Sequence, residues 1–529
     1  MHFIQDNNMA ATSTNIQKYS ALLYFISNFR KHLFNFHKSL FPNDKKFDTI
    51  IKISICLAMV SLVAIDILFL ERISMVREEM RQNPYGRAFM LFALIFIAIN
   101  IVEFLWRFYL VCKYKPVSSS TDDELLSCSV VVPAFNEGKQ VYMTLKSLAE
   151  SDYPLRKLQI IAVDDGSVDD TWEWISKAKQ ELGSKLMAIK LPQNKGKRHA
   201  LYLGFQQSTG DVLVTVDSDS EVKPDTLRNL ISPFVKNSKI GGVAGNIRVL
   251  NLNEGIIPKM LDVIFLFSFD FIRASQSMVN TVMCTPGALS AYRKDVVTPI
   301  LSEWLNQTFL GRPSTIGEDR AMTNLIVREG YNVFYQQNAV AFTNVPVGYT
   351  NLCKMLLRWA RSHIRETIVM ARFIFKKFRK HSALGARINF ILNSFGIILS
   401  PLFIFVTIAF CCWHIVEFGI SILIGIIFTS SAASILYTKR CGNSDGLFAY
   451  LYGVFVLVSL SWISAYSLVT VHHSGWLTRG DSSKTGKLSK GKYRVYFNSD
   501  GVKPLKQFPL KNNNLSTSCY SDCELKKAS

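Results

Sequence analysis

Charged residues are scarce in this chain, and acidic ones are scarcer than basic ones. Only 19% of the 529 residues are charged, and 60 Lys and Arg outnumber 40 Asp and Glu. The ten cysteines form no C-x-x-C pair, which argues against a zinc site or a disulfide framework. Basic helices and aromatic–basic sheet motifs are also lacking, so the net charge of +20 does not predict nucleic-acid binding. The placement of the basic residues is more informative than their number.

Charge is nearly absent from several long apolar runs. Residues 49–70 and 88–111 are each long enough to cross a bilayer as a helix, 388–437 can form two such helices, and 446–471 another. These runs predict an integral protein of the plasma (inner) membrane. The first span follows a polar and basic leader, so no cleavable signal peptide is predicted.

Basic residues flank these spans and fill the tail, which predicts that the flanks and the central domain are cytosolic. Five spans would instead put the basic tail outside. Either 446–471 does not cross fully, or 388–437 is divided differently, with Pro401 as a plausible break.

Residues 126–300 alternate short β-branched runs with amphipathic stretches. Strands are predicted at LLSCSVVVPAF, LQIIAVDD, LMAIKL and DVLVTVDSD, and helices at YMTLKSLAES, TWEWISKAKQEL and HALYLGFQQS. Strands that alternate with helices predict a mostly parallel sheet, which binds ligands at the carboxyl ends of its strands. The expected fold class is therefore an α/β domain with a mostly parallel sheet, combined with transmembrane helices.

Unusual polar residues fall at those strand ends. The first strand ends in PAFNEG (133–138), the second in Asp164–Ser167 and the fourth in Asp217–Ser218–Asp219. An isolated D-x-D occurs by chance in many proteins, but here it has acidic neighbours on the same sheet edge. The stretch NKGKRHAL (194–201) adds basic residues before a helix, which suits a diphosphate: Lys195, Lys197 and Arg198. Together these residues predict a metal–nucleotide-diphosphate site.

Asp217 and Asp219 are the predicted metal ligands. In an extended segment, residues i and i+2 point the same way, so the two carboxylates can share one ligand. Hard oxygens suit Mg²⁺ or Mn²⁺, which usually binds one or two carboxylates and substrate phosphates. Asp165, on an adjacent strand end, is suited to accept hydrogen bonds from a nucleoside.

Four motifs resemble, in order, the signature of processive family 2 glycosyltransferases: Asp164–Ser167, Asp217–Asp219, Gly317–Arg320 and Leu357–Trp359. Within that group the chain looks most like hyaluronan synthases and the related chitin-oligosaccharide synthases. Residues 274–293 are similar to the segment those enzymes use beside the acceptor. SGWLTRG (474–480) is similar to their C-terminal gating segment.

The resemblance implies a cytosolic GT-A domain that transfers sugars from UDP-GlcNAc and UDP-GlcA to a growing polysaccharide and extrudes it through its own channel. It implies Mg²⁺ or Mn²⁺ as the cofactor, held by Asp217 and Asp219. Asp319 would be the general base of an inverting transfer, with Arg358 and Trp359 as its catalytic partners at the acceptor and the diphosphate. The implied substrate-binding residues are Ala134, Asn136, Glu137, Asp165, Lys195, Lys197, Asp217, Gly287, Arg320, Trp476, Thr478 and Arg479.

Simpler roles exist for several of these residues. Asp319 opens a predicted helix, where an acidic residue is a common cap. Trp359 can be a membrane-interface tryptophan. Cys284 is assigned to packing, and the His472–His473 pair to the interface rather than to a metal.

The chain departs from the family pattern at three positions. Met355 stands where the family usually has Gln, Leu477 where many relatives have Gly, and Glu318 gives GED in place of GDD. No catalytic carboxylate is lost, so a scaffold with an inactive transferase domain is not expected. The alternatives are a chitin-oligosaccharide or poly-GlcNAc synthase using UDP-GlcNAc alone, another extracellular polysaccharide synthase, and a lipid-carrier transferase. Lipid-carrier enzymes generally lack the Arg358–Trp359 and Trp476–Arg479 segments.

The expected organisation has seven parts. Two amphipathic stretches, 254–275 and 352–380, are expected as core or membrane-surface helices, the surface position being favoured for the second. The lipid bilayer is an expected partner, nucleic acid is not, and the oligomeric state is left open. The parts are a leader (1–48), two transmembrane helices (49–112), the GT-A domain (126–350), amphipathic interface helices (351–385), C-terminal transmembrane helices (386–471), the gating segment (472–490) and a polar tail (491–529).

Overall fold

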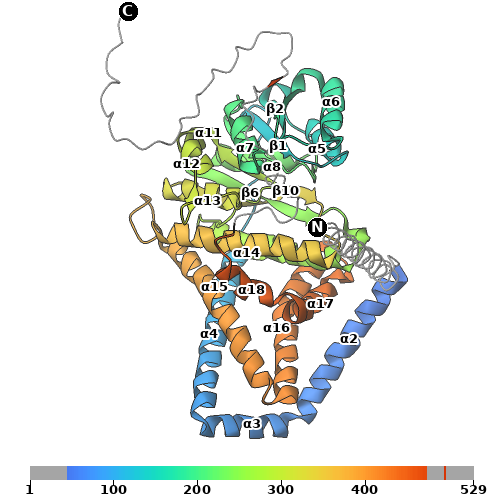
Figure 1. Cartoon of the computed structure of the whole chain (residues 1–529), viewed down its shortest axis with the longest axis vertical. Coiled ribbons are helices and arrows are strands. Elements are labelled where there is room, and N and C mark those ends of the chain that lie inside the picture. Colours follow the sequence, from blue (N-terminus) through green and yellow to red (C-terminus); the bar gives the residue numbers. More distant parts are fainter. Residues whose placement is uncertain (1–44, 474–493, 496–529) are drawn as a thin grey trace, which may run out of the picture.

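The chain folds into two parts with one long helix between them. The computed structural model describes residues 45–473 and 494–495. A twisted sheet with its helices forms an α/β domain, and a group of long helices extends away from one side of it (Figure 1). Helix α14 (Tyr349–Ala371) lies across the ends of these long helices, between the two parts. The expected combination of an α/β domain with a mostly parallel sheet and long apolar helices is confirmed.

The main sheet has the strand order β11-β3-β2-β1-β4-β7-β6-β10-β5. Its first half, β3-β2-β1-β4, is parallel, because crossover helices connect these strands. Strand β7 is antiparallel to both of its neighbours and joins this half to the parallel pair β6–β10. The strands are β1 Cys128–Ala134, β2 Leu158–Asp164, β3 Leu186–Lys190, β4 Val212–Thr215, β5 Ser220–Val222, β6 Ile240–Val249, β7 Ser290–Arg293, β10 Asn332–Thr343 and β11 Arg494–Val495. A separate two-stranded sheet pairs β8 (Thr308–Phe309) with β9 (Arg312–Pro313).

All four predicted strands are present, as are the three predicted helices between them. Strand β1 is buried along its whole length, and the Val and Ile side chains of β1 and β2 form the centre of the core. Strand β11, from the segment expected to be a polar tail, pairs with the edge strand β3. The helices of this domain are α5 Gln140–Ala149, α6 Thr171–Leu182, α7 Lys197–Gln206, α8 Thr226–Lys236, α9 Ile256–Phe267, a π-helix at Ser268–Arg273, α10 Ala274–Met278, α11 Lys294–Val297, α12 Leu301–Leu305 and α13 Glu318–Arg328.

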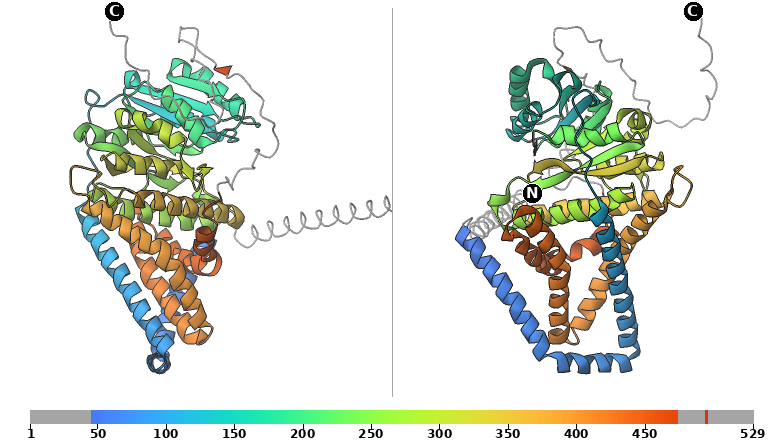
Figure 2. Two further views of the ribbon diagram at one scale, coloured as in Figure 1. Left: turned by 60° about the vertical axis from the view of Figure 1, so that its left-hand side comes forward. Right: turned by 180° about the vertical axis from the view of Figure 1, so that it is seen from behind.

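Four of the remaining helices are long and apolar enough to cross a membrane. They are α2 (Lys45–Leu68), α4 (Pro84–Lys113), α15 (Leu384–Cys411) and α16 (Ile415–Cys441). Helix α3 (Leu70–Gln82), which the sequence did not predict, connects α2 and α4 at the end farthest from the α/β domain (Figure 2). Pro401 lies inside α15 and does not divide it.

The stretch 446–471 does not form one straight helix. Its segments 444–460 and 462–469 meet at an angle of 48°, so they count as a fifth span only if a broken pair is accepted. Helices α17 (Phe448–Phe455) and α18 (Trp462–Val469) stay close to α14 and do not reach the far end (Figure 1). The described residues therefore contain four candidate spans, or five if this bent pair is counted as one span, and both alternatives that the sequence left open remain.

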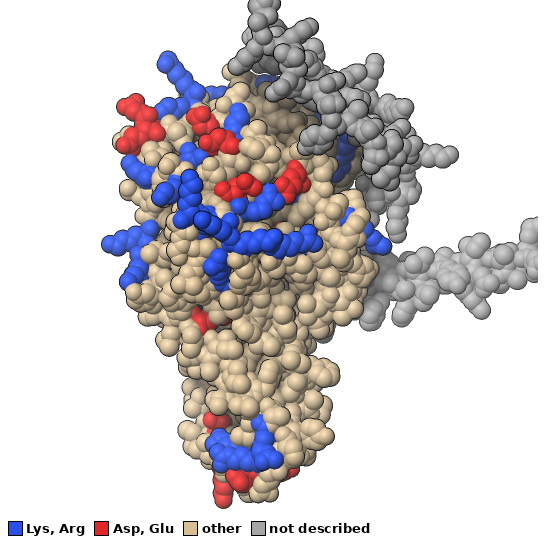
Figure 3. All heavy atoms as spheres, turned by 90° about the vertical axis from the view of Figure 1, so that its left-hand side faces the viewer, with Lys and Arg blue, Asp and Glu red and all other residues tan. Residues whose placement is uncertain are grey.

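Charged side chains are distributed unevenly along the long axis of the molecule. Lys and Arg gather on the α/β domain and at its boundary with the long helices (Figure 3). Below this boundary the visible surface is almost uncharged until the far end, where α3 carries Arg and Glu side chains. An uncharged zone between two charged ends is the surface pattern of a protein that spans a bilayer.

Helix α7 approaches β1 so closely that Gly204 leaves no room for a side chain. A Cβ atom there would lie 2.3 Å from Cγ1 of Val131. We expect Gly204→Ala to destabilise the α/β domain by about 1–3 kcal/mol through overpacking. The matched control is Gly419→Ala in α16. A Cβ atom at Gly419 would meet no neighbouring atom within 4 Å, so this substitution should be neutral or slightly stabilising. Melting temperatures of the two detergent-solubilised variants test this, and equal values would contradict the close packing.

Candidate functional site

The candidate site is one large cavity of about 2470 Å³ at the carboxyl ends of β1, β2 and β4. It extends past α13 and α14 and reaches the long helices α4 and α15 and the short helix α17. Most of the residues predicted from the sequence line it. They are Ala134, Asn136, Asp165, Lys195, Lys197, Asp217, Asp219, Gly287, Asp319, Arg320, Arg358 and Trp359.

One of the described residues among the predicted set, Glu137, is not part of this lining. Its backbone amide donates to Thr171 Oγ1 at 2.8 Å. Trp476, Thr478 and Arg479 lie outside the described residues.

Asp165, at the end of β2, organises the basic loop that follows β3. Its two carboxylate oxygens accept hydrogen bonds from the backbone amides of Lys195 at 2.9 Å and Gly196 at 2.7 Å. Burial raises the pKa of Asp165 to about 6, although these two amides oppose the shift. The carboxylate that the sequence assigned to a nucleoside therefore already shapes the loop beside the nucleoside position.

The loop after β1 contains a residue in the left-handed backbone conformation, and hydrogen bonds of this residue hold the loop in place. Asn136 has φ 53°, and its Oδ1 accepts a hydrogen bond from the Val168 amide at 3.0 Å. Its own amide donates to Ser167 Oγ at 3.0 Å. The loops that follow β1 and β2 are thus held together at one edge of the cavity.

Asp217 and Asp219 lie in a turn, and the expected extended segment is not formed. Strand β4 ends at Thr215, and β5 begins at Ser220 after the turn, in which the Ser220 amide donates to Asp217 O at 3.1 Å. The i, i+2 argument for a shared direction of the two side chains therefore does not apply. Asp219 Oδ1 accepts a hydrogen bond from Thr343 Oγ1 of β10 at 3.2 Å, whereas Asp217 faces Lys197.

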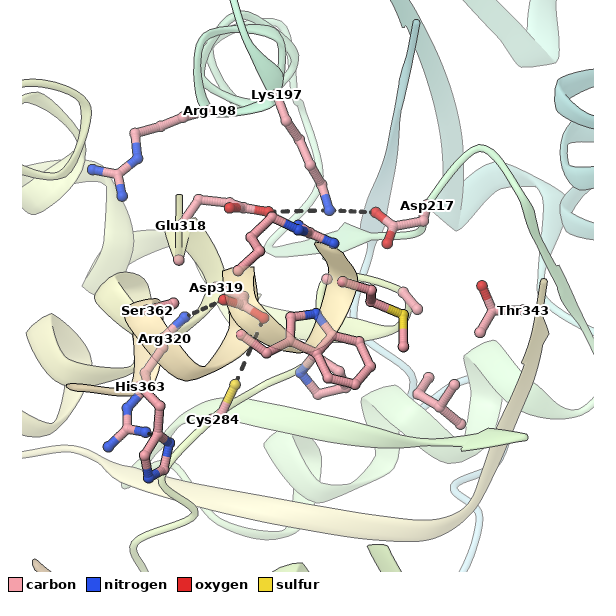
Figure 4. Close-up of a pocket in the computed structure, with 18 of the residues that line it drawn as sticks. Lys197, Arg198, Asp217, Cys284, Glu318, Asp319, Arg320, Thr343, Ser362 and His363 are labelled. Carbon is pink, nitrogen blue, oxygen red and sulfur yellow. Dashed lines mark hydrogen bonds and ion pairs between the residues drawn. The ribbon is translucent and has the colours of Figure 1, made fainter. Parts of the chain in front are cut away.

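Lys197 forms a bridge between two acidic motifs. Its Nζ lies 2.5 Å from Asp217 Oδ1 and 3.1 Å from Glu318 Oε1 (Figure 4). Burial opposes the charge, but the two carboxylates outweigh it and raise the pKa of Lys197. Gly287 completes this contact, because a Cβ atom there would lie 2.6 Å from Lys197 Nζ. Glu318 is a site residue that the sequence argument treated only as a departure from GDD.

Asp319 lies in the first turn of α13 and does not cap it. The N-cap is Gly317, with φ 78°, and no side chain caps the helix. Asp319 Oδ1 accepts a hydrogen bond from the Arg320 amide at 2.7 Å, and the Cys284 thiol donates to Oδ2 at 3.6 Å (Figure 4). Cys284 therefore contacts the candidate base, a position that its assignment to packing did not anticipate.

The two acids at the start of α13 differ in their pKa. For Glu318, burial works to raise the pKa, but the charges of Lys197 and Arg358 outweigh it and lower the pKa. For Asp319, burial and the adjacent charge of Glu318 raise the pKa. Two neighbouring carboxylates with separated pKa values are typical of sites that need one ionised group and one proton acceptor.

Helix α14 supplies the opposite wall of the cavity. Arg358 and Trp359 both line it, and the Trp359 ring lies 6.0 Å from that of Phe265 on α9. Trp359 is 42% exposed, so part of its side chain is not covered by neighbouring residues. Arg320 points elsewhere: its guanidinium contacts His363 and Thr367 of α14, away from Lys197 (Figure 4).

The end of the cavity nearest the long helices contains charged residues that the sequence argument missed. Arg107 and Glu103 of α4 form an ion pair at 2.7 Å, and Arg107 Nη1 donates to Ser275 Oγ at 3.1 Å. Asn393 of α15 and Tyr452 of α17 line the same region. The available signal was an acid and a base at i, i+4 spacing inside an otherwise apolar run.

Comparisons with known proteins agree on one class. Residues 129–300 match the family described as glycosyl transferase family 2. An N-acetylglucosaminyltransferase from Azorhizobium caulinodans is 30% identical over 384 residues, which cover 71% of this chain and 95% of that protein. A hyaluronan synthase from Streptococcus pyogenes is 29% identical over 392 residues, covering 70% of this chain and 88% of that protein.

A solved structure shows the same fold. The mannosyltransferase of Pyrobaculum calidifontis, in complex with GDP-Man and Mn²⁺, matches with a TM-score of 0.50 and 17% sequence identity. The match covers 73% of this chain and 96% of that one. The α/β domain is thus a GT-A glycosyltransferase domain. By its similarity over most of its length, the chain belongs to glycosyltransferase family 2, with relatives named hyaluronan synthase and N-acetylglucosaminyltransferase.

The close approach of Gly287 to Lys197 gives a test of the Lys197 bridge. We expect Gly287→Ala to push Lys197 Nζ away from Asp217 and to lower glycosyl transfer by about tenfold or more, the effect of losing one charged contact. The melting temperature should be nearly unchanged, because a flexible side chain moves. Gly348→Ala, with no atom within 4 Å, is the control and should keep full activity. Full activity of Gly287→Ala would show that the bridge is dispensable.

Proposed function

We propose that the protein is a membrane-embedded processive polysaccharide synthase that transfers sugars from UDP-sugars to a growing polymer. The observation that carries this proposal is the continuity of the cavity. It runs from Asp165 and Asp217 at the strand ends to Asn393 and Tyr452 among the long helices. A polymer extended in such a cavity has a path toward helices that are long enough to cross a bilayer.

Asp319 is the proposed general base of an inverting transfer. Such a transfer needs a base that takes the proton of the acceptor hydroxyl while the anomeric carbon is attacked. The raised pKa of Asp319 makes its carboxylate a stronger proton acceptor than an ordinary Asp, while Glu318 stays ionised against Lys197. Arg358 and Trp359 are proposed to hold the acceptor, since the Trp359 ring offers a flat face to a sugar.

The donor is proposed to bind along the other edge of the cavity. Asp165 would lie on the uridine side, with Ala134 and Asn136 beside it, and Lys195, Lys197 and Gly287 near the diphosphate. Trp476, Thr478 and Arg479 are proposed to close over the nucleotide. Arg320 is better explained by its contacts on α14 than by donor binding.

The D-x-D turn fits Mg²⁺ or Mn²⁺. Asp217 and Asp219 offer hard oxygen ligands, and Asp217 already pairs with a cation of the protein. Among residues 45–473 and 494–495, no group of three His, Cys, Asp or Glu forms a complete metal cage. This matches a cation that is shared with substrate phosphates. Such a cation supplies charge stabilisation to the departing diphosphate. The Mn²⁺ complex of the P. calidifontis enzyme supports a divalent cation on this fold.

UDP-GlcNAc and UDP-GlcA are the proposed donors, and hyaluronan is the proposed product. The S. pyogenes relative, which carries the name hyaluronan synthase, supports this choice. The second candidate is a synthase of chitin-like oligosaccharides or poly-GlcNAc that uses UDP-GlcNAc alone. The A. caulinodans relative, named an N-acetylglucosaminyltransferase, favours it.

The catalytic domain is proposed to lie on the cytosolic side of the plasma (inner) membrane. Helices α2, α4, α15 and α16 would cross the bilayer, with α14 at its cytosolic surface. The basic side chains at the boundary of the two parts support this orientation through the positive-inside rule.

The direct test measures UDP release and polymer formation by the purified protein with Mn²⁺ or Mg²⁺. UDP-GlcNAc and UDP-GlcA are supplied singly and together, and the product is treated with hyaluronidase or chitinase. We expect a hyaluronidase-sensitive polymer only when both donors are present. A chitinase-sensitive product from UDP-GlcNAc alone would establish the second candidate.

Two Asn variants control this experiment. Asp219→Asn should lower turnover by about 100-fold or more while the protein stays folded and membrane-inserted, since a ligand of the catalytic cation is lost. Asp152→Asn, at a largely exposed ion pair with Arg228, should behave like the unmodified protein. Polymer synthesis at the normal rate by Asp219→Asn would contradict the metal assignment.

The pKa of Asp165 predicts a pH dependence of nucleoside binding. As the pH falls through about 6, Asp165 gains a proton and can no longer accept both loop amides, so the affinity should fall. For one proton, the dissociation constant of uridine should rise about tenfold between pH 7 and pH 5. Uridine is the probe because its base and ribose do not titrate in this range. The Asp165→Asn variant should bind weakly at every pH and show no such slope, whereas an identical slope in both would assign the titration to another group.

A further inference from the structure

The Arg320 guanidinium is buried, yet it forms no ion pair with a carboxylate within the described residues. It is 3% exposed, and its Nη2 donates to Thr367 Oγ1 at 3.0 Å. Its Nη1 contacts Nδ1 of His363, which must therefore carry a lone pair on that atom. Nε has no hydrogen-bond partner in the same region. The orientation of this charge thus depends on two side chains of α14.

Thr367 connects three helices. Its hydroxyl oxygen accepts from Arg320 of α13 and from Nδ2 of Asn393 of α15, at 3.0 Å and 3.1 Å. The same hydroxyl donates to the carbonyl of His363, one turn earlier on α14, at 2.7 Å. All of its hydrogen-bonding capacity is therefore used, and no water is needed to complete it.

Asn393 brings a membrane helix into this set of contacts. It is on α15, one of the four helices long enough to cross a bilayer, and it also lines the cavity. Besides Thr367, it contacts the imidazole of His363. A displacement of α15 therefore changes the contacts of Thr367 and His363, the two side chains that hold Arg320. Arg320 follows Asp319 in the first turn of α13.

We propose that Arg320, His363, Thr367 and Asn393, here called the α14 network, position the Asp319 carboxylate according to the placement of α15. The inference rests on the proposed function, in which Asp319 acts on the acceptor and α15 borders the polymer path. A buried charge that loses one of two partners must reorient or draw in water. Asp319 Oδ1 accepts a hydrogen bond from the backbone amide of Arg320 at 2.7 Å, so a shift of Arg320 within the first turn of α13 is passed on to the candidate base. Sugar transfer then proceeds fully only while α15 is in the position that holds Asn393 against Thr367.

The fold does not depend on this network. Helix α13 is also docked on α14 through Asn324, whose Nδ2 donates to Glu366 O at 2.9 Å and to Glu366 Oε2 at 2.8 Å. Removing the Thr367 hydroxyl leaves these contacts unchanged. We therefore expect loss of the Thr367 hydroxyl to change the rate of sugar transfer and to leave the fold intact.

The test compares Thr367→Val, which removes the hydroxyl at nearly constant shape, with Thr367→Ser, which keeps it. For Thr367→Val we expect kcat to fall about tenfold, with KM for the UDP-sugar within about twofold of the original value. UDP released per sugar incorporated should rise, because water competes once the base is displaced. Thr367→Ser should restore both quantities. A Thr367→Val protein with normal kcat and normal UDP-to-sugar ratio would overturn the proposal, as would equal losses in both variants.

Asn393→Leu tests the link to α15 independently, because it leaves the contact of Arg320 with Thr367 in place. We expect the same direction of change, and no further loss when it is combined with Thr367→Val. The neighbouring Ser394→Ala, whose hydroxyl bonds only within α15, is the matched control and should have no effect. Unchanged kinetics of Asn393→Leu would overturn the coupling to α15. If instead the unmodified protein releases no UDP from any donor, that result contradicts the proposed function and not the proposal about the α14 network.

Discussion

The bridge formed by Lys197 is the interaction on which the rest of the site depends. One ammonium group, at the first residue of α7, holds Asp217 from the turn after β4 and Glu318 from the start of α13. These segments are about one hundred residues apart in the sequence and belong to different halves of the sheet. Removing Lys197 would leave the carboxylates of Asp217 and Glu318 facing each other without a cation, which is more costly than loss of a surface pair. The bridge therefore fixes the distance between the D-x-D turn and the candidate base.

Helix α14 transmits this arrangement to the rest of the molecule. One face presents Arg358 and Trp359 to the cavity, and another holds Arg320 through His363 and Thr367. A third holds the end of α18: Arg361 donates to Thr470 Oγ1, and Arg365 donates to the carbonyls of Val471 and His473. The helix is thus in contact with the first turn of α13, with the long apolar helix α15 and with the residues that follow α18.

Much of the fold was predictable because it follows from local patterns. The β-branched runs gave four strands, the amphipathic stretches between them gave α5, α6 and α7, and the apolar runs gave α2, α4, α15 and α16. Helix α3 was missed because it lies in a polar linker without an apolar run. The two carboxylates of the D-x-D motif were placed on an extended strand because β-branched residues precede them, whereas β4 ends at Thr215 so that the chain can turn into β5.

By itself, the sequence determined the class of the protein, the positions of the four long apolar helices and the set of acidic and basic residues at one sheet edge. Periodicity and motif spacing are properties of neighbouring residues, so they can be recognised without coordinates. Only the tertiary structure decided that Lys197 faces Glu318, that Arg320 faces α14 and that Asn393 reaches the same network. These pairings join segments far apart in the chain. Side-chain direction at a helix start depends on which helices pack against it, and that packing is fixed only when the whole core is assembled.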